Sequence, residues 1–177
     1  IDDYNFSTSR QKNLRKNIKK IIVIDDSFNK RYLCDLIINY SFSKQKNIQD
    51  LKKKNFGTWL ALGKDFLPLN NAIVRIKKKA KIRNDLNKIL IFFGGSSQKK
   101  LSRKMLEIIT HFKEIFFYIV GDKEDLKELQ NEKRANTKFF SNIENNELCK
   151  IMVKSDLAIG SGGFNLYERV FLGLPAI

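Results

Sequence analysis

The sequence predicts an α/β fold in which parallel sheets are covered by helices, and two repeated patterns support this prediction. Short, nearly continuous apolar runs, such as 88–93 and 115–120, are typical of strands buried on both faces of a parallel sheet. Stretches with apolar residues at spacings of three and four follow several of these runs, as expected for helices that pack on a sheet. Because the two patterns alternate along the chain, parallel pairing of the strands is favoured.

The first half of the chain contains three predicted strands, at 21–24, 36–38 and 59–62. Two helices are predicted beside them from their apolar residues, Leu14, Ile18, Ile48 and Leu51. The first strand ends in Asp25 and Asp26, where ligands of parallel sheets gather. A pair of aspartates at this position more often caps the following turn than belongs to a ligand site.

The second half repeats the same device of strand, turn and helix. Its predicted strands lie at 88–93, 115–120 and 137–140, and its predicted helices at 124–132 and 145–153. Another helix is predicted after the first of these strands from its apolar residues, Leu101, Met105, Ile108, Ile109 and Phe112. The lysine-rich, glycine-free run 76–87 is the best linker candidate, so we expect one domain at 1–75 and a second at 88–177.

The stretch 155–177 combines a strand at 157–159, a glycine corner at 160–163 and a helix that Gly173 and Pro175 bring to an end. Its helical pattern predicts one apolar face made of Leu166, Tyr167, Val170 and Phe171. The last four residues have the pattern of a chain entering another strand. Because that strand is cut short and the chain begins with Ile1 rather than Met, we expect a fragment of a longer protein.

The glycine corner has the chemistry of a phosphate site. Glycines lack a Cβ, so an anionic group can lie directly on the amides that begin the next helix. Glu168, about one turn into that helix, could accept hydrogen bonds from two ribose hydroxyls. The corner could equally serve packing alone, and Glu168 could act only on the helix dipole. The dinucleotide fingerprint is not met, because Asn165 occupies the third glycine position.

Composition excludes several classes of function. The formal charge of +15 is spread along a chain rich in Lys, Asn, Ile and Phe, and because A/T-rich codons encode these residues, genome composition is a sufficient cause of the charge. No known nucleic-acid-binding motif accompanies the charge, so we expect no nucleic-acid partner. Cys34 and Cys149 have no metal or disulfide spacing and are expected to be buried thiols of a cytoplasmic protein. No apolar run approaches the length of a membrane span, so no stable membrane insertion is expected. His111, the single histidine, is expected to be a solvated cap, and no catalytic triad, metal cluster or Walker lysine is present.

Several motifs taken in order resemble the PseG family, nucleotide-sugar hydrolases of pseudaminic acid biosynthesis that are related to MurG-type glycosyltransferases. Phe93-Gly94-Gly95-Ser96 matches the first phosphate-side loop of that family's second domain. Residues 160–168, GSGGFNLYE, are similar to its Gly-Ala-Gly-Gly-x-Thr-x-x-Glu motif, with Asn165 in place of the threonine. Asp2-Asp3-Tyr4 resembles its Asp-His-Tyr, with Asp3 replacing the histidine.

The resemblance implies two Rossmann-like domains of GT-B type, both incomplete here, and hydrolysis of UDP from a UDP-linked acetamido-deoxy sugar without any cofactor or metal. It assigns diphosphate contacts to Gly94, Gly95, Ser96, Gly162, Gly163 and Asn165, the ribose contact to Glu168, and a place facing the sugar to Tyr4. The family's general base is a histidine upstream of this chain, so the fragment itself is expected to be inactive. A glycosyltransferase with a UDP-sugar donor and a basic binding module without catalytic activity are the alternatives.

Overall fold

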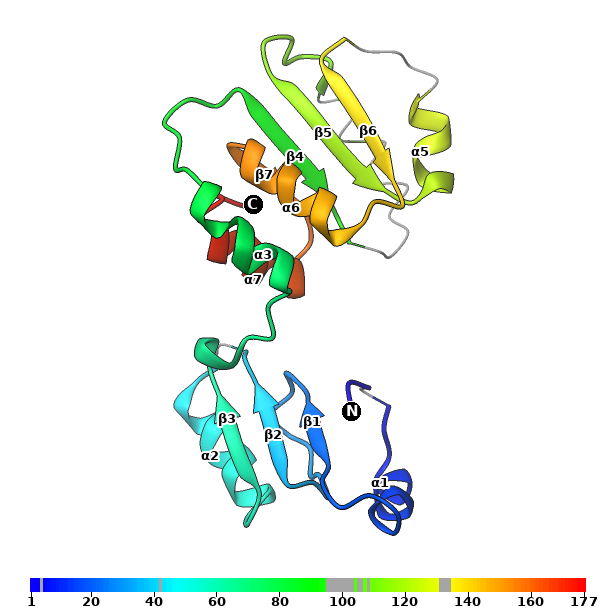
Figure 1. The fold of residues 1–177 in the computed structure, drawn as a ribbon, viewed down its shortest axis with the longest axis vertical. Coiled ribbons are helices and arrows are strands. Elements are labelled where there is room, and N and C mark those ends of the chain that lie inside the picture. The colour runs from blue at the N-terminus through cyan, green and yellow to red at the C-terminus, as the bar shows by residue number, and fades with distance from the viewer. Residues whose placement is uncertain (4, 42, 95–103, 105–106, 108, 131–134) are drawn as a thin grey trace. The chain divides into compact units, whose positions relative to one another are not determined.

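The structure is a computed structural model that describes residues 1–177 except 4, 42, 95–103, 105–106, 108 and 131–134. The chain forms two compact units, Ile1–Pro68 and Leu69–Ile177. Each unit carries one sheet whose strands are all parallel, with helices packed on it, which confirms the predicted α/β class and its Rossmann-like layering (Figure 1).

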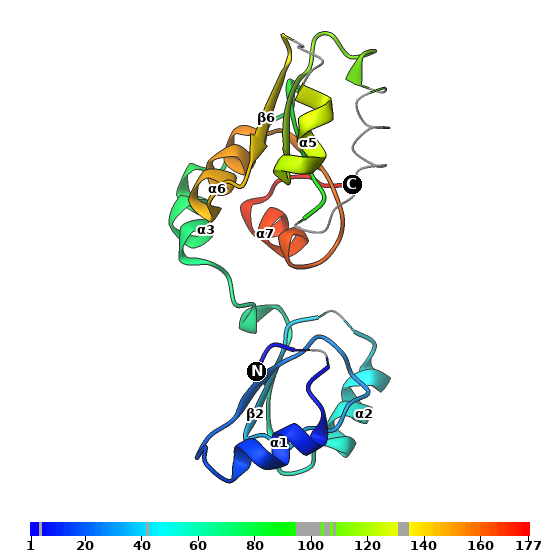
Figure 2. The ribbon, with the colours of Figure 1, turned by 90° about the vertical axis from the view of Figure 1, so that its right-hand side faces the viewer.

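The first unit contains a three-stranded sheet in the order β1-β2-β3. Its elements are α1 (Thr8–Arg15), β1 (Ile22–Ile24), β2 (Leu36–Asn39), α2 (Gln45–Lys54), β3 (Trp59–Leu62) and the short 3-10 helix η1 (Lys64–Phe66). Figure 2 shows α1 and α2 on the same side of this sheet. The connection from β1 to β2, residues 25–35, contains no helix.

The core of the first unit lies between its sheet and the elements packed on it. It is formed by Ile21, Val23, Tyr32, Cys34 and Ile37, with Leu14 of α1 packed against them. The prediction that Ile18 belongs to the first helix is wrong, because α1 ends at Arg15 and Ile18 is 42% exposed.

Asp25 is a buried carboxylate at the carboxyl end of β1, and its contacts are structural. It accepts hydrogen bonds from the Tyr32 hydroxyl and from the Ser27 backbone N–H, the latter at 2.5 Å. Burial alone would raise the pKa of Asp25, but these hydrogen bonds outweigh it and the pKa is lowered. Asp25 therefore caps the turn after β1, and the exposed Asp26 lies beside it.

Asp35 should make the stability of the protein fall in acid. Its carboxylate accepts from Arg15 Nη1 at 2.5 Å and from the Ile21 backbone N–H at 2.8 Å, and these contacts hold its pKa well below the ordinary value. A lowered pKa gives stability that is present above the ordinary value and is lost as the pH falls toward the folded value. In urea unfolding at a series of pH values, Asp35→Asn should be less stable than wild type at pH 7, and the difference should begin to narrow as the pH falls below about 4.

The exposed carboxylate Asp26 provides the control for that experiment. Asp26→Asn should leave both the stability at neutral pH and its acid dependence unchanged. A gap between wild type and Asp35→Asn that is constant with pH would contradict the role given to the Asp35 charge.

The second unit contains a four-stranded sheet in the order β6-β5-β4-β7. Its elements are α3 (Asn71–Ile76), the 3-10 helix η2 (Lys77–Lys79), β4 (Lys88–Phe92), β5 (Phe116–Gly121), α5 (Lys123–Gln130), β6 (Thr137–Ser141), α6 (Asn145–Lys154), β7 (Leu157–Ile159) and α7 (Phe164–Leu172). The predicted strands of this half are confirmed. The helix predicted from Leu101 to Phe112 falls largely on residues outside the described part of the chain.

Both faces of this second sheet are covered by packed side chains. On one face, Leu90 and Val120 join residues of α3, α6 and α7 in a buried cluster. On the other face, Ile91 and Ile119 pack with Leu126 of α5. Figure 2 shows α3 and α6 on the opposite side of the sheet from α5. The near-continuous apolar strands of this half are explained by this burial on both faces.

Residues 69–87 pack within the second unit. Ile73 of α3 is fully buried in the same cluster as α6. Arg83 donates to the backbone carbonyls of Ser155 and Val153 and lies 3.3 Å from a carboxylate oxygen of Asp156. The compact units thus divide between Pro68 and Leu69, while the sequence-based domain limits, with their linker at 76–87, stay predictions.

Candidate functional site

The second sheet changes its direction of winding between β4 and β7. The chain runs from β4 to β5 and β6 on one side, then returns to place β7 on the other side of β4. Ala176, after α7, forms a parallel bridge with Ala158, so the chain continues outward from β7. In open α/β sheets, ligands bind at the carboxyl ends of the two strands that flank such a switch point.

The two glycine corners lie next to each other at this point. Gly94 follows β4 with a φ of +88°, and residues 160–163 follow β7. Ser161 Oγ donates to the Phe93 backbone carbonyl at 2.7 Å, so the corners are joined by a hydrogen bond. A Cβ on Gly94 would lie 3.8 Å from that same Oγ.

Gly162 and Gly163 have open space above them. A Cβ added to either glycine would meet no atom of a described residue within 4 Å, and both glycines are exposed. The backbone N–H groups of Gly162, Gly163 and Asn165 donate to no described residue. Since Gly163 is the N-cap of α7, these donors lie at a helix N-terminus, where the dipole favours negative charge.

Arg169 places a buried positive charge directly behind this corner. The side chain is 2% exposed, and it donates from Nη2 to the Ser161 carbonyl at 2.6 Å and from Nε to the Asn165 carbonyl at 3.1 Å. Burial lowers the pKa of Arg169, but a guanidinium remains charged at neutral pH. No described carboxylate forms an ion pair with it. The negative charge of Glu168 compensates this buried cation in part, and a bound anion would offset more of the cost of burying it.

Glu168 is a half-buried carboxylate on the same helix. Burial raises the pKa of Glu168, and the positive charge of Arg169 opposes that rise. Burial raises the pKa of the Cys149 thiol of α6, and the negative charge of Glu168 adds to that rise. Glu168 accepts no hydrogen bond from a described residue. A carboxylate with a raised pKa on the helix that follows a glycine corner is a candidate for a functional role.

The apolar face predicted for α7 is only partly right, because Phe171 packs against the core but two of its four residues are exposed. Val170 is 64% exposed and Leu166 is 39% exposed, whereas Arg169 and Leu172 are the buried residues of the helix. The hydrogen bonds of Arg169 to two backbone carbonyls satisfy its buried guanidinium and fix this orientation. Sequence reasoning missed Arg169 because charged residues are ordinarily assigned to the solvent-facing side. The sequence did contain one indication of this role: Arg169 lies one turn after Asn165 and on the same side of the helix.

Most of the site residues proposed from the sequence belong to this region. Gly94, Gly162, Gly163, Asn165 and Glu168 lie on the two corners or on the helix that follows them. Tyr4, Gly95 and Ser96 lie outside the described residues. Among the residues that the structure does describe, no group of three or more His, Cys, Asp or Glu side chains is placed to hold a metal ion. The same part of the chain contains no helix of the length and apolar character that a bilayer crossing requires.

Comparison with known proteins gives two relatives. The chain is 31% identical over 192 residues to an uncharacterized protein of Methanocaldococcus jannaschii, an alignment that covers 100% of this chain and 39% of that protein. It is 27% identical over 120 residues to the spore coat polysaccharide biosynthesis protein SpsG of Bacillus subtilis, covering 65% of this chain and 35% of that protein. No model of a protein family matches the chain. The chain therefore spans well under half the length of each of these relatives.

Proposed function

We propose that the protein acts on a nucleotide-linked sugar and that the corners after β4 and β7 hold its diphosphate. The single observation that carries this proposal is the open glycine corner with free N–H donors at the switch point of the second sheet. The similarity to a polysaccharide biosynthesis protein supports a sugar substrate. The more specific reaction that we propose is hydrolysis of a UDP-linked acetamido-deoxy sugar of the pseudaminic acid type, in the cytoplasm.

The chemistry follows from where charge develops in such a reaction. When the bond between the anomeric carbon and the diphosphate breaks, negative charge grows on the departing diphosphate oxygen. Fixed N–H donors at Gly162, Gly163 and Asn165 would stabilise that charge without rearranging, and the charge of Arg169 behind them would add to the effect. Glu168 would orient the nucleoside by accepting from the ribose hydroxyls. Activation of the attacking water is assigned to a base outside this chain.

Transfer of the sugar to an acceptor is the second candidate, and it is favoured by one observation. The printed name of the Bacillus relative refers to polysaccharide biosynthesis, in which sugars are joined rather than released. The two reactions share the nucleotide site and differ in the group that attacks. Incubating the full-length protein with a UDP-sugar and no acceptor separates them, because only hydrolysis then releases free sugar and UDP at a catalytic rate.

The ribose contact gives a sharp binding prediction. In calorimetric titration of the full-length protein with UDP, Glu168→Ala should weaken binding about 30-fold, since a hydrogen bond to a charged group contributes about 2 kcal/mol. Glu168→Gln should have a smaller effect, because the amide oxygen still accepts.

Glu147→Ala is the matched control for the ribose contact. It removes the same charge from an exposed position on the neighbouring helix α6 and should leave UDP affinity unchanged. Equal UDP affinity in wild type and Glu168→Ala would remove Glu168 from the site. No measurable UDP binding by wild type would overturn the proposed function itself.

A further inference from the structure

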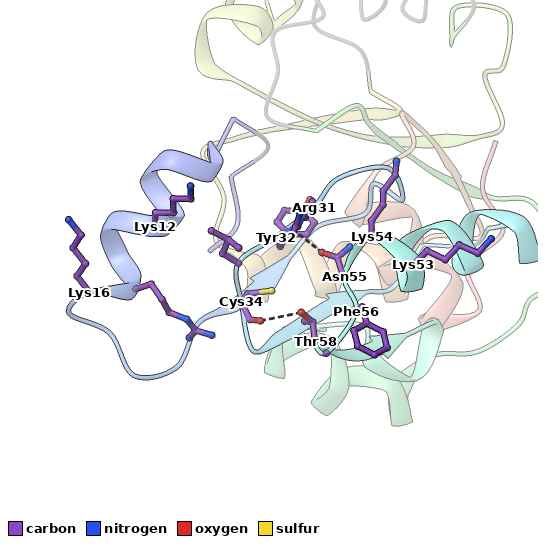
Figure 3. Close-up of a pocket in the computed structure, with 13 residues that line it drawn as sticks. Lys12, Lys16, Arg31, Tyr32, Cys34, Lys53, Lys54, Asn55, Phe56 and Thr58 are labelled. Atoms are coloured by element: carbon purple, nitrogen blue, oxygen red, sulfur yellow. Dashed lines mark hydrogen bonds between the residues drawn. The ribbon is translucent and has the colours of Figure 1, made fainter.

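A concave site lies in the first unit. A groove of about 950 Å³ opens between α1 and α2, and residues 31–34 of the β1–β2 connection are among those that line it. In Figure 3, Lys12 and Lys16 lie on one side of the groove and Lys53 and Lys54 on the other, with Cys34 and Thr58 between them. The volume is at the upper end of the range for small-molecule sites.

Hydrogen bonds hold the floor of the groove in place. Buried Asn55 accepts from the Tyr32 backbone N–H at 2.8 Å and donates to the Lys30 and Leu51 carbonyls, both at 3.0 Å. Thr58 Oγ1 donates to the Cys34 carbonyl at 3.3 Å. These contacts tie the β1–β2 connection to the end of α2 and to the start of β3. The groove is thus a formed feature of the fold.

The groove is strongly basic. Six cationic side chains line it, and no Asp or Glu is among its described lining residues: Lys12, Arg15, Lys16, Arg31, Lys53 and Lys54. Asp35 holds Arg15, and Lys54 donates to the Asn29 carbonyl. The other four make no hydrogen bond or ion pair with any described residue. Burial raises the pKa of the Cys34 thiol to about 11, so the groove carries no thiolate that would repel an anion at neutral pH.

Lysines at helix ends also have an ordinary explanation, which is too small to account for this cluster. Both α1 and α2 carry basic residues in their last turns, where cations complement the helix dipole. Each helix end contributes only about half a negative charge. Even with the full charge of Asp35 added, these negative charges leave the six cations well in excess.

Phe56 adds an apolar surface at the edge of the groove. Its side chain is 97% exposed, and it lines the groove together with the basic residues (Figure 3). A flat ring beside unpaired cations matches a ligand that has both an aromatic group and several negative charges. A single nucleic-acid strand would need a continuing channel and a series of stacking rings. Among the described lining residues the only other aromatic ring is that of Tyr32, which is buried.

We infer that this basic groove binds a nucleoside polyphosphate, with its phosphates on Lys12, Lys16, Arg31 and Lys53 and its base against Phe56. This inference is independent of the function proposed for the second unit. Its ligand is recognised mainly by phosphate charge, whereas the corner after β7 is built from backbone donors and one carboxylate.

The test is titration of the full-length protein with two probes, ATP and inorganic triphosphate. The double variant Lys12→Glu/Lys53→Glu should weaken the binding of both probes by about tenfold or more, the effect of losing a single charge-assisted hydrogen bond. Lys78→Glu/Lys79→Glu makes the same change in net charge at exposed lysines of η2 and should leave both affinities unchanged. Equal losses in the two double variants would overturn the inference, because they would show only a general charge effect.

Phe56→Ala distinguishes the contribution of the base to ligand binding from the contribution of the phosphates. This variant should weaken ATP binding about tenfold and leave triphosphate binding unchanged, since stacking on an aromatic side chain contributes about 1–3 kcal/mol per base. Glu168→Ala should alter neither affinity for the groove, which keeps this result distinct from the proposed function. The inference would be overturned by ATP binding that is unchanged in Phe56→Ala. It would also be overturned if a single-stranded RNA displaced ATP from the groove at a lower concentration than the concentration at which ATP itself binds.

Discussion

Replacing Gly160 with alanine should lower the free energy of unfolding by about 3 kcal/mol or more, because the added methyl group has no space. Its Cβ would lie 2.0 Å from the carbonyl oxygen of Phe92 and 3.0 Å from Arg169 Nη1. The Phe92 oxygen is backbone at the end of β4, next to the pairing of Ile91 with Ile159. It can move away only if β4 and β7 separate.

Gly160 is also fixed on the other side of its strand. Its N–H donates to the Ile177 carbonyl at 3.0 Å, so the residue cannot shift outward without breaking that hydrogen bond as well. Urea denaturation followed by circular dichroism measures the effect. We expect the midpoint to fall while the dependence of the unfolding free energy on urea stays the same, as for a change in the folded state alone.

Gly162→Ala is the matched control, two residues away in the same corner. Among the residues that the structure describes, none has an atom within 4 Å of a Cβ at Gly162, and the φ of Gly162 lies outside the left-handed region. The substitution should therefore cost less than about 1 kcal/mol of unfolding free energy, the usual effect of a change that disturbs no packing. Under the proposed function it should still weaken UDP binding, because the methyl group stands where the diphosphate approaches the backbone. Equal stabilities of Gly160→Ala and Gly162→Ala would contradict the packing described for Gly160.

The sequence was sufficient to predict the strands because their apolar runs are local and end at clear turn residues. It also placed the end of α7, where Gly173 adopts the left-handed conformation with a φ of +75°. The order β6-β5-β4-β7 could not be read in the same way, since it depends on pairing between segments far apart in the chain. That order is what brings Gly94 and Ser161 together.

Two errors of the sequence analysis share a physical cause. The short helix α3 was not predicted, although Asn70 caps it by accepting from the Ala72 backbone N–H at 2.8 Å. In the sequence, α3 is indicated only by one capping residue and a short apolar run. The lysines that follow dominate the composition of the segment, which favours its interpretation as a linker. The predicted face of α7 was only partly right because hydrophobic patterns take no account of hydrogen bonds that let an arginine be buried. In both cases specific polar contacts outweighed average composition.

Arg169→Met should show whether Arg169 serves ligand binding or the stability of the fold. We expect UDP affinity to fall about 100-fold, as the site loses the charge behind the corner and the two hydrogen bonds that fix the Ser161 and Asn165 carbonyls. Uridine has no phosphate, so its affinity should fall much less. The measurement is calorimetric titration of the full-length protein with UDP and with uridine.

The stability of the same variant should move little. Losing two hydrogen bonds from a charged donor costs about 1.5–3 kcal/mol each, but removing a buried charge that forms no ion pair with a described residue relieves a desolvation penalty of several kcal/mol. Because these terms oppose each other, we expect the free energy of unfolding to change by less than about 1 kcal/mol. Arg169→Lys keeps the charge without the planar fork, so its UDP affinity should lie between those of wild type and Arg169→Met. The opposite result would be an Arg169→Met variant that unfolds at a much lower urea concentration but, where it is folded, binds UDP like wild type. In that case Arg169 serves only to hold α7 against the strand ends. Its charge then has no part in recognising the diphosphate.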